Sequence, residues 1–280
     1  MLTDYHVHLR PDQEGTTPEG YFTRENAERY RAAAAERGIE ELGVAEHVHR
    51  FVQALEVWDH PWWQHWAHDD IDEYCAFVRE QTDLRLGIEA DYVAGAEGRM
   101  AALLEGRDWD YVVGSVHFVA DKALDLSGLE AWRVWDIWRS DDPEKVWTRY
   151  FEALGEAARS GMFDILAHPD LVKVFGREGP WPEGDLRRFY ELAMEGIAES
   201  DVAIEVSTAG LRKPVGEIYP SAEFLEMCLE AGRPVALSSD AHRPHQLGHE
   251  YARAVEWLGE RGVREICVFE RRRKRLEPLG

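Results

Sequence analysis

The sequence predicts an α/β protein built as a parallel barrel, either TIM-like or a distorted relative of that fold. Three observations support this prediction. Short apolar runs alternate with longer segments of helical periodicity along the whole chain, and polar residues follow each apolar run directly. No linker rich in proline, glycine or serine divides the 280 residues, so a single domain over residues 1–280 is expected.

The apolar runs define seven expected strands. They cover Thr3–His8, Glu41–His47, Arg85–Asp91, Asp110–His117, Asp164–His168, Val202–Ser207 and Pro234–Asp240. A last apolar run, Glu265–Phe269, could form an eighth. Glycine stop signals mark the ends of the clearest helices between the strands, because glycine readily takes the left-handed conformation that ends a helix. These helices are Glu25–Arg37 before Gly38, Pro143–Arg159 before Gly161 and Ser221–Ala231 before Gly232.

Two tryptophan-rich stretches interrupt this alternation. The first, residues 49–69, carries Trp58, Trp62, Trp63 and Trp66, and the second, residues 118–142, carries Trp132, Trp135 and Trp138. Long loops at the carboxyl ends of barrel strands often build substrate pockets and lids. The alternative is that these tryptophans pack against the barrel, as large aromatic side chains usually do.

Composition and charge exclude several classes of protein. The formal net charge is −22, which repels nucleic acid and anionic lipid, and no apolar run is long enough to cross a bilayer. We expect no membrane and no nucleic-acid partner; the basic run at residues 271–275 is interpreted as a solvated face. Cys75, Cys228 and Cys267 are interpreted as buried reduced thiols, and the absence of a secretory signal predicts a cytoplasmic location.

Histidines and acids gather at the carboxyl ends of the expected strands. His6 and His8 lie two apart on the first strand and therefore share a face. Five of the other strands end on or near His47, Glu89, His117, His168, and Asp240 with His242. Eight such groups exceed the three or four protein ligands of one ion, so more than one zinc, iron or manganese ion is expected. A bridging carboxylate such as Glu89 would allow two ions to activate hydroxide for attack on phosphorus.

The strings that contain these residues resemble the PHP (polymerase and histidinol phosphatase) superfamily over nearly the whole chain. They are DYHVH at 4–8, EH at 46–47, GIEAD at 87–91, GSVH at 114–117, AHPD at 167–170 and SDAH at 239–242. Longer strings resemble its histidinol-phosphatase branch, namely HPDLVK at 168–173, EVSTAGLRK at 205–213 and EIYPS at 217–221. The resemblance implies a distorted seven-stranded barrel, two or three divalent ions, and hydrolysis of L-histidinol phosphate in histidine biosynthesis.

The resemblance also implies a distribution of the ligands. It places His6, His8, Glu89 and Asp240 on one ion, Glu89, His117 and His168 on a second, and His47 with His242 on a third. Many relatives supply a further histidine after the first motif, where this chain has Asp12 and Glu14. We take Asp12 as the substitute ligand and Glu14 as the second choice.

A phosphomonoester dianion needs local cations in so acidic a protein. Arg212 and Lys173 follow strand ends and are the expected phosphate contacts, with His245 as a weaker candidate. Asp240 and His242 are the candidate catalytic residues, since either could donate a proton to the leaving alkoxide. The sequence does not specify the oligomeric state.

Three other functions compete with this interpretation. One is a different PHP phosphoesterase, a phosphotyrosine phosphatase or a nuclease, although the acidic composition disfavours a nuclease. Another is an amidohydrolase, whose barrel also opens with His-x-His but usually needs a lysine where this chain has Glu89. The third is a metal-binding regulatory domain without catalysis, which normally loses several ligands. Release of phosphate that a chelator abolishes would separate the enzymes from the third.

Overall fold

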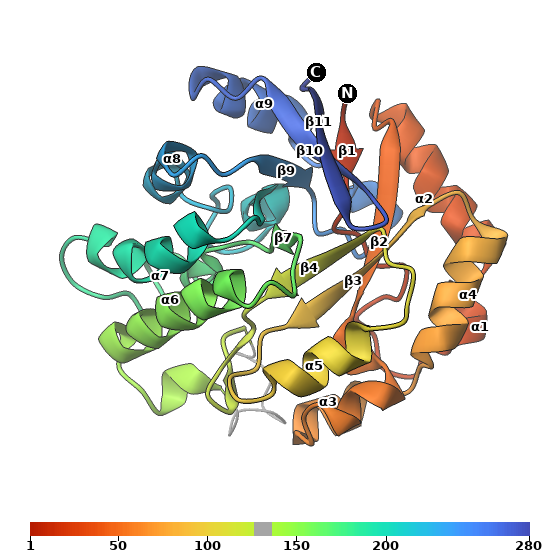
Figure 1. The fold of residues 1–280 in the computed structure, drawn as a ribbon, viewed down its shortest axis with the longest axis horizontal. Coiled ribbons are helices and arrows are strands. Elements are labelled where there is room, and N and C mark those ends of the chain that lie inside the picture. Colours follow the sequence, from red (N-terminus) through yellow and green to blue (C-terminus); the bar gives the residue numbers. More distant parts are fainter. Residues whose placement is uncertain (126–135) are drawn as a thin grey trace.

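The computed structural model describes residues 1–125 and 136–280. Seven parallel strands form one sheet in the order β1-β2-β3-β4-β7-β8-β9, which curls into a nearly closed barrel (Figure 1). A parallel bridge between Val7 and Ala241 joins its two edges. The strands are β1 Thr3–Asp4, β2 Glu41–His47, β3 Arg85–Asp91, β4 Tyr111–Ser115, β7 Ile165–Leu166, β8 Ala203–Ser207 and β9 Val235–Ser238. The predicted α/β fold, a distorted parallel barrel, is therefore confirmed.

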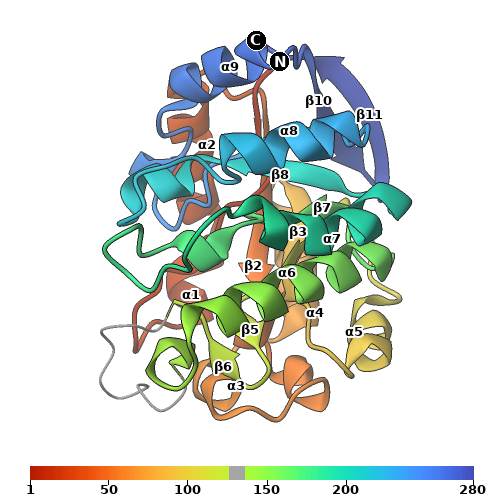
Figure 2. The ribbon, with the colours of Figure 1, turned by 90° about the vertical axis from the view of Figure 1, so that its left-hand side faces the viewer.

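Helices surround the barrel, and α6, α7 and α8 lie along one side of it (Figure 2). Their bounds are α1 Pro18–Tyr21, α2 Arg24–Glu36, α3 Pro61–Trp66, α4 Ile71–Gln81, α5 Glu97–Leu104, α6 Pro143–Arg159, α7 Arg187–Glu199, α8 Ala222–Glu230 and α9 Tyr251–Glu260. All three helices predicted from glycine stops are present within one residue at each end. Of the helices in the described part of the chain, none is long and apolar enough to cross a membrane.

Local capping fixes where several helices begin. The side chain of Asp142 accepts a hydrogen bond from the backbone N–H of Lys145, and Pro143 occupies the first helical position of α6. The side chain of Asp70 caps α4 in the same way, through the N–H groups of Asp72 and Glu73. These caps satisfy backbone donors that would otherwise lack partners at the helix ends.

A second, small sheet closes the amino end of the barrel. It is a hairpin of β10 (Glu265–Glu270) and β11 (Arg273–Pro278), and its residues Cys267, Val268 and Phe269 pack with the barrel interior beside Tyr5 and Tyr111. Glu265–Phe269 is thus a strand, as expected, but it pairs with β11 rather than forming an eighth barrel strand. The termini meet here as well, since the Met1 ammonium donates to the carbonyls of Pro278 and Gly280.

Close packing in the barrel interior requires glycine on two strands. A Cβ atom on Gly43 of β2 or on Gly87 of β3 would overlap the ring of Tyr111, which is fully buried. The aromatic ring therefore fills the space that the missing side chains leave, as expected for an interior packed to crystal-like density.

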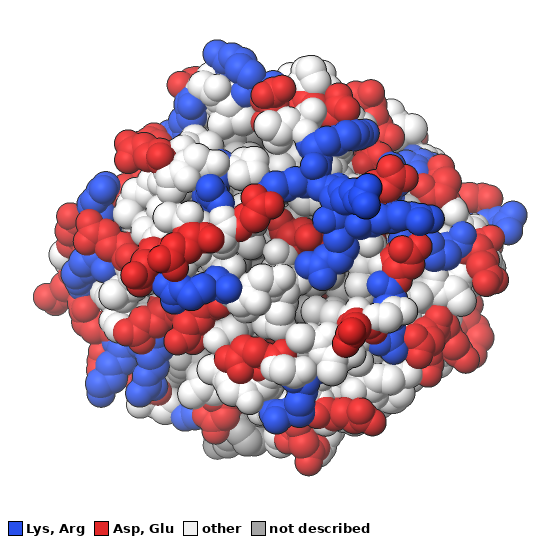
Figure 3. Space-filling model, viewed as in Figure 1, with Lys and Arg blue, Asp and Glu red and all other residues white. Residues whose placement is uncertain are grey.

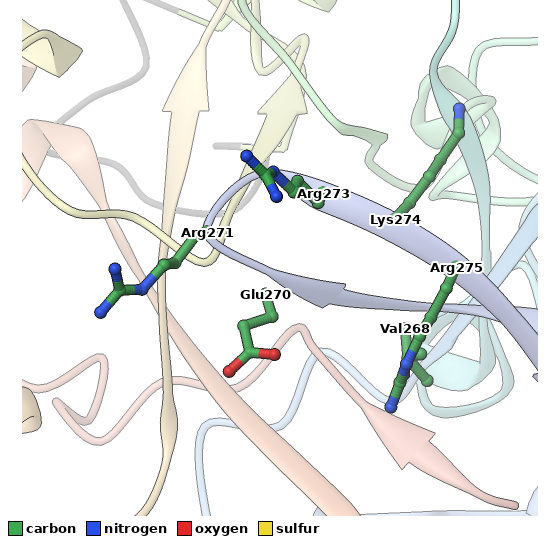
Figure 4. A pocket seen from close by; sticks show the side chains of 6 residues that line it. All are labelled: Val268, Glu270, Arg271, Arg273, Lys274 and Arg275. Carbon is green, nitrogen blue, oxygen red and sulfur yellow. The ribbon is translucent and has the colours of Figure 1, made fainter.

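The basic run 271–275 occupies the hairpin turn and the start of β11, and Lys and Arg side chains gather over this face (Figure 3). Lys274 and Arg275 point to opposite sides of β11 (Figure 4), and Lys274 pairs with Asp201 at 2.6 Å. Arg272 pairs with Asp164 at 2.8 Å, whereas Arg271 and Arg273 are largely exposed. The predicted solvated face is present, but two of its cations also hold the hairpin onto the barrel.

Four predicted strands are longer than the observed ones at their carboxyl ends. The regular ladders end at Asp4, Ser115, Leu166 and Ser238. Beyond two of these ends, His168 and Asp240 adopt positive φ angles of 23° and 49°, which are incompatible with a β-ladder. The strands end where the chain turns away from the ladder, and the turn places polar side chains over the barrel mouth.

The first tryptophan-rich stretch folds against the barrel. Trp63 is fully buried, and Trp58 and Trp62 pack partly buried against the same core, in agreement with the packing alternative. In the second stretch a two-stranded hairpin forms from β5 (Phe118–Val119) and β6 (Lys122–Ala123), while Trp132 and Trp135 lie outside the described residues. The three cysteines are free thiols, as predicted, although Cys75 is only half-buried.

Candidate metal centre

The predicted ligands converge on Glu89, at the carboxyl end of the barrel. Its Oε1 lies 3.4 Å from Nε2 of His117 and 3.3 Å from Nε2 of His168. Its Oε2 lies 3.3 Å from Nε2 of His6, 3.7 Å from Nε2 of His8, and in contact with Nδ1 of His47. One carboxylate therefore faces different histidines with each oxygen, which is the geometry of a bridging ligand.

Asp240 and His242 extend the cluster on one side. Asp240 Oδ1 is 3.5 Å from Nε2 of His8 and 3.6 Å from Nδ1 of His242. The ring of His8 stacks against those of both His47 and His242, with centroids 4.2 and 4.1 Å away. Within the described residues, four triplets lie close enough to hold an ion. They are His8-His47-His242, His6-His8-Asp240, His6-Glu89-His168 and His47-Glu89-His117.

The two candidates for the extra ligand differ in position. Asp12 Oδ2 lies 3.1 Å from Nε2 of His242, while its Oδ1 pairs with Arg50. Glu14 is exposed and pairs with His65 at 3.3 Å. The structure therefore brings Asp12, and not Glu14, to the edge of the cluster.

Several buried atoms of the cluster make no hydrogen bond within the described part of the chain. Nε2 of His6, both ring nitrogens of His8 and Oε2 of Glu89 belong to this group. A buried polar atom without a partner is costly, yet Nε2 of His6 and Nε2 of His8 lie only 3.3 and 3.7 Å from Oε2 of Glu89. Imidazole nitrogens around carboxylate oxygens are the donor set for zinc, iron or manganese, so a divalent ion fits these residues.

The electrostatics keep the acids of the cluster ionised. Burial alone would raise the pKa of Glu89, but His47, His6 and His117 hold it well below its usual range. For His117, burial would lower the pKa, yet Glu89 and Asp91 raise it to about 10. Without a bound cation, the cluster therefore holds its charge balance with protons on histidine, which a metal ion would displace.

The structure also contains site residues that the sequence-based prediction missed. Asp91 Oδ1 accepts from Nδ1 of His117 at 2.8 Å, and Glu46 Oε1 accepts from the backbone N–H groups of Leu9 and Arg10. Glu205 contacts Nδ1 of His6 at 2.7 Å. The sequence did show carboxylates within apolar strands. Burying a carboxylate is costly unless a hydrogen-bond donor or a cation lies beside it.

The three residues predicted to contact phosphate lie in different environments. Arg212 donates through Nη2 to the carbonyls of Ser239 and Asp240, and its buried Nη1 has no hydrogen-bond partner in the described residues. Lys173 is buried, and its ammonium contacts Asp170, Glu217 and the carbonyl of Ile218. His245 is exposed in the turn that follows β9.

A parallel α/β barrel that aims histidines and acids at a shared carboxylate defines a metal-dependent hydrolase. Comparison with known proteins agrees. The model of the PHP domain family matches residues 23–209, which is more than half of the chain. The chain belongs to the PHP domain family, as the sequence motifs indicated.

Named relatives and a solved structure extend this result. The chain is 32% identical to the "Probable histidinol-phosphatase" of Deinococcus radiodurans, over 87% of this chain and 90% of that protein. It is 26% identical to the histidinol-phosphatase of Bacillus subtilis, over 81% and 91%. The fold matches the histidinol phosphate phosphatase of Lactococcus lactis, solved with zinc, L-histidinol and phosphate, with a TM-score of 0.70 at 17% identity over 98% of both chains.

Proposed function

We propose that this chain is a histidinol-phosphatase, which hydrolyses L-histidinol phosphate to L-histidinol and inorganic phosphate in histidine biosynthesis. The observation that carries the proposal is Glu89, which faces histidines with both of its oxygens in a chain similar to histidinol-phosphatases over most of its length. The residues 1–280 act as one domain, and the pathway favours a cytoplasmic location.

The cluster would hold two or three divalent ions, of zinc, iron or manganese. Glu89 belongs to two of the sites, with His6, His8 and Asp240 on one side and His117 and His168 on the other. His47, His242 and Asp12 form the third, supported by the 3.1 Å contact between Asp12 and His242. Bound there, the ions would supply Lewis-acid activation of the attacking water and of the phosphate.

Arg212 is the best placed residue to bind the phosphate. Its Nη2 is fixed by two carbonyls beside Asp240, and this leaves Nη1 available for a charge-assisted hydrogen bond to a phosphate oxygen. Lys173 contributes positive charge from a buried position but already contacts two carboxylates, so its part is smaller. His245, exposed at the rim, contributes least.

Asp240 and His242 handle the proton that the leaving alkoxide requires. Burial would raise the pKa of Asp240, but His6 and the other histidines beside it hold that pKa well below its usual range. Burial lowers the pKa of His242 to about 4, so at neutral pH its ring is neutral. Both groups are therefore unprotonated at neutral pH, as metal ligands must be. An atom of either group that binds no metal would accept the proton of the attacking water, and its low pKa would then favour transfer of that proton to the leaving alkoxide.

A substrate screen tests the proposed function. Purified holoenzyme is assayed for phosphate release from L-histidinol phosphate, other amino-alcohol phosphates, sugar phosphates and phosphotyrosine. We expect kcat/KM for histidinol phosphate to exceed that for each of the other esters by on the order of a hundredfold, or about 3 kcal/mol of transition-state binding. Preference for phosphotyrosine would instead support the alternative PHP phosphatase.

A further inference from the structure

Strand β8 differs from the other six strands of the barrel. Each of those six supplies at least one predicted metal ligand, at its end or just beyond it, and β8 supplies none. Yet β8 carries Glu205 in the middle of the sequence Ala-Ile-Glu-Val-Ser, and this side chain is only 1% exposed. A carboxylate buried inside a strand is stable only when hydrogen-bond donors contact its oxygens.

Three donors from three other parts of the chain meet at Glu205. Its Oε1 lies 2.7 Å from Nδ1 of His6 and accepts a hydrogen bond from the hydroxyl of Ser238 at 2.7 Å. Its Oε2 accepts from the backbone N–H of His168 at 2.5 Å. Glu205 thus joins the segment after β1, the segment after β7 and the end of β9.

The contact with His6 determines which ring nitrogen is free. In the neutral ring that binds metal, Nδ1–H donates to Glu205 and Nε2 carries the lone pair; this nitrogen lies 3.3 Å from Glu89 Oε2 and 3.9 Å from Asp240 Oδ1. A carboxylate that takes the second N–H of a histidine ligand fixes its tautomer and orientation and strengthens it as a donor to metal.

The contact with His168 holds an unfavourable backbone conformation. His168 has a φ of 23°, outside the regions that residues with a Cβ atom prefer, so the surrounding contacts must hold this conformation in place. Its N–H is anchored by Glu205, and its Nε2 then lies 3.3 Å from Glu89 Oε1. The same carboxylate therefore supports one ligand on each side of Glu89.

We propose that Glu205 is a positioning residue that couples the two sides of the metal cluster, through the His6 ring and the His168 backbone together. Loss of this carboxylate weakens metal binding on both sides of Glu89 at once, rather than at one site. The inference rests on the metal centre of the proposed function, but it holds for any phosphate ester that the enzyme hydrolyses.

Zinc affinity of the Glu205→Gln variant tests this coupling. A glutamine offers one oxygen and one NH2 group, so it cannot accept from both His6 and His168. Stripped protein is titrated with Zn²⁺ against a chromophoric chelator, and bound zinc is counted by elemental analysis. We expect affinity to fall about 10- to 100-fold at two or more sites. The absorption spectrum of the Co²⁺-loaded variant should also change, because the ligand geometry changes.

Two further variants keep the test decisive. Glu205→Asp retains the charge but is too short to reach both donors, so its zinc affinity should fall between those of wild type and Glu205→Gln; it serves if the glutamine variant does not fold. Asp110→Asn is the matched control, because Asp110 is also a buried carboxylate that accepts a backbone N–H, from Leu86 at 2.9 Å, but at the opposite end of the barrel.

The outcomes separate clearly. Unchanged zinc affinity in both Glu205 variants, loss of a single site only, or an equal loss in Asp110→Asn would overturn the inference. Because zinc binding is measured without substrate, a wrong substrate assignment would leave this result unaffected. Conversely, an enzyme that prefers another phosphate ester could still show the coupled loss.

Discussion

The two ends of the barrel use the same residue types for opposite purposes. At the amino end, buried or nearly buried carboxylates face arginine: Asp110 pairs with Arg79 at 2.7 Å, and Asp164 pairs with Arg272 at 2.8 Å. At the carboxyl end, five histidines surround Glu89 within the described residues, and Asp240 likewise faces histidines. The surrounding histidines, rather than the carboxylate itself, distinguish the metal cluster from the ion pairs at the amino end.

Physical chemistry explains this difference. An arginine stays charged at every accessible pH, so it neutralises its carboxylate partner and offers no lone pair to a metal ion. A histidine can lose its proton and then offers a lone pair, so a carboxylate surrounded by histidines can exchange protons for metal ions. Glu205 and Asp91 extend this arrangement, because each contacts the second nitrogen of a histidine that faces Glu89.

The largest expected effect comes from Glu89→Gln. An amide carries no charge and is a poor bridge between cations, so we expect loss of bound metal and of about 4 kcal/mol of transition-state stabilisation. That free energy is roughly a thousandfold in kcat/KM. Elemental analysis and phosphate-release kinetics on the same preparation measure both.

The matched change at the amino end is Asp110→Asn. It should lower the free energy of unfolding by about 1–3 kcal/mol, because the charge-assisted contact with Arg79 is lost. Metal content and kcat should stay at the wild-type level. If Asp110→Asn lost metal, or Glu89→Gln kept it, the functional contrast between the two ends would be wrong.

A smaller effect is expected for Arg212→Ala. Loss of one charge-assisted hydrogen bond to phosphate should cost about 1.5–3 kcal/mol, which is roughly tenfold or more in kcat/KM. Metal content should not change, since Arg212 ligates nothing. Kinetics with histidinol phosphate and an aryl phosphate decide its role: no change with either ester removes Arg212 from the site, and a loss with histidinol phosphate alone assigns it to the amino-alcohol end.

A change of pH, without any substitution, is expected to alter metal affinity in a graded way. With a pKa of about 10 in the absence of metal, His117 is protonated at neutral pH, and metal binding must displace that proton. Affinity should therefore rise with pH between about 6 and 9, by about tenfold per pH unit for each proton released. Titrations of zinc at several pH values measure this slope; a flat profile would mean that no ligand is protonated before metal binds.

Sequence reasoning identified the side chains that cluster at the barrel mouth, but it was less accurate for the ends of the strands that carry them. The observed bounds match the predicted ones for two strands, Glu41–His47 and Arg85–Asp91, because their apolar residues continue almost to the strand end. The strand predicted to reach His168 ended early, because a positive φ leaves no trace in hydrophobic periodicity. The role of Glu205 was missed for a related reason: its three donors come from distant parts of the chain, which only the closed barrel brings together.

Metal removal and restoration test the central claim most directly. The holoenzyme is treated with a chelator until elemental analysis finds no metal, and hydrolysis of histidinol phosphate is measured before and after addition of zinc, manganese or iron. Activity should disappear with the metal and return with at least one of these ions, because the charge around Glu89 is completed by cations. Undiminished turnover by a metal-free sample would contradict the assignment of this cluster as the catalytic centre.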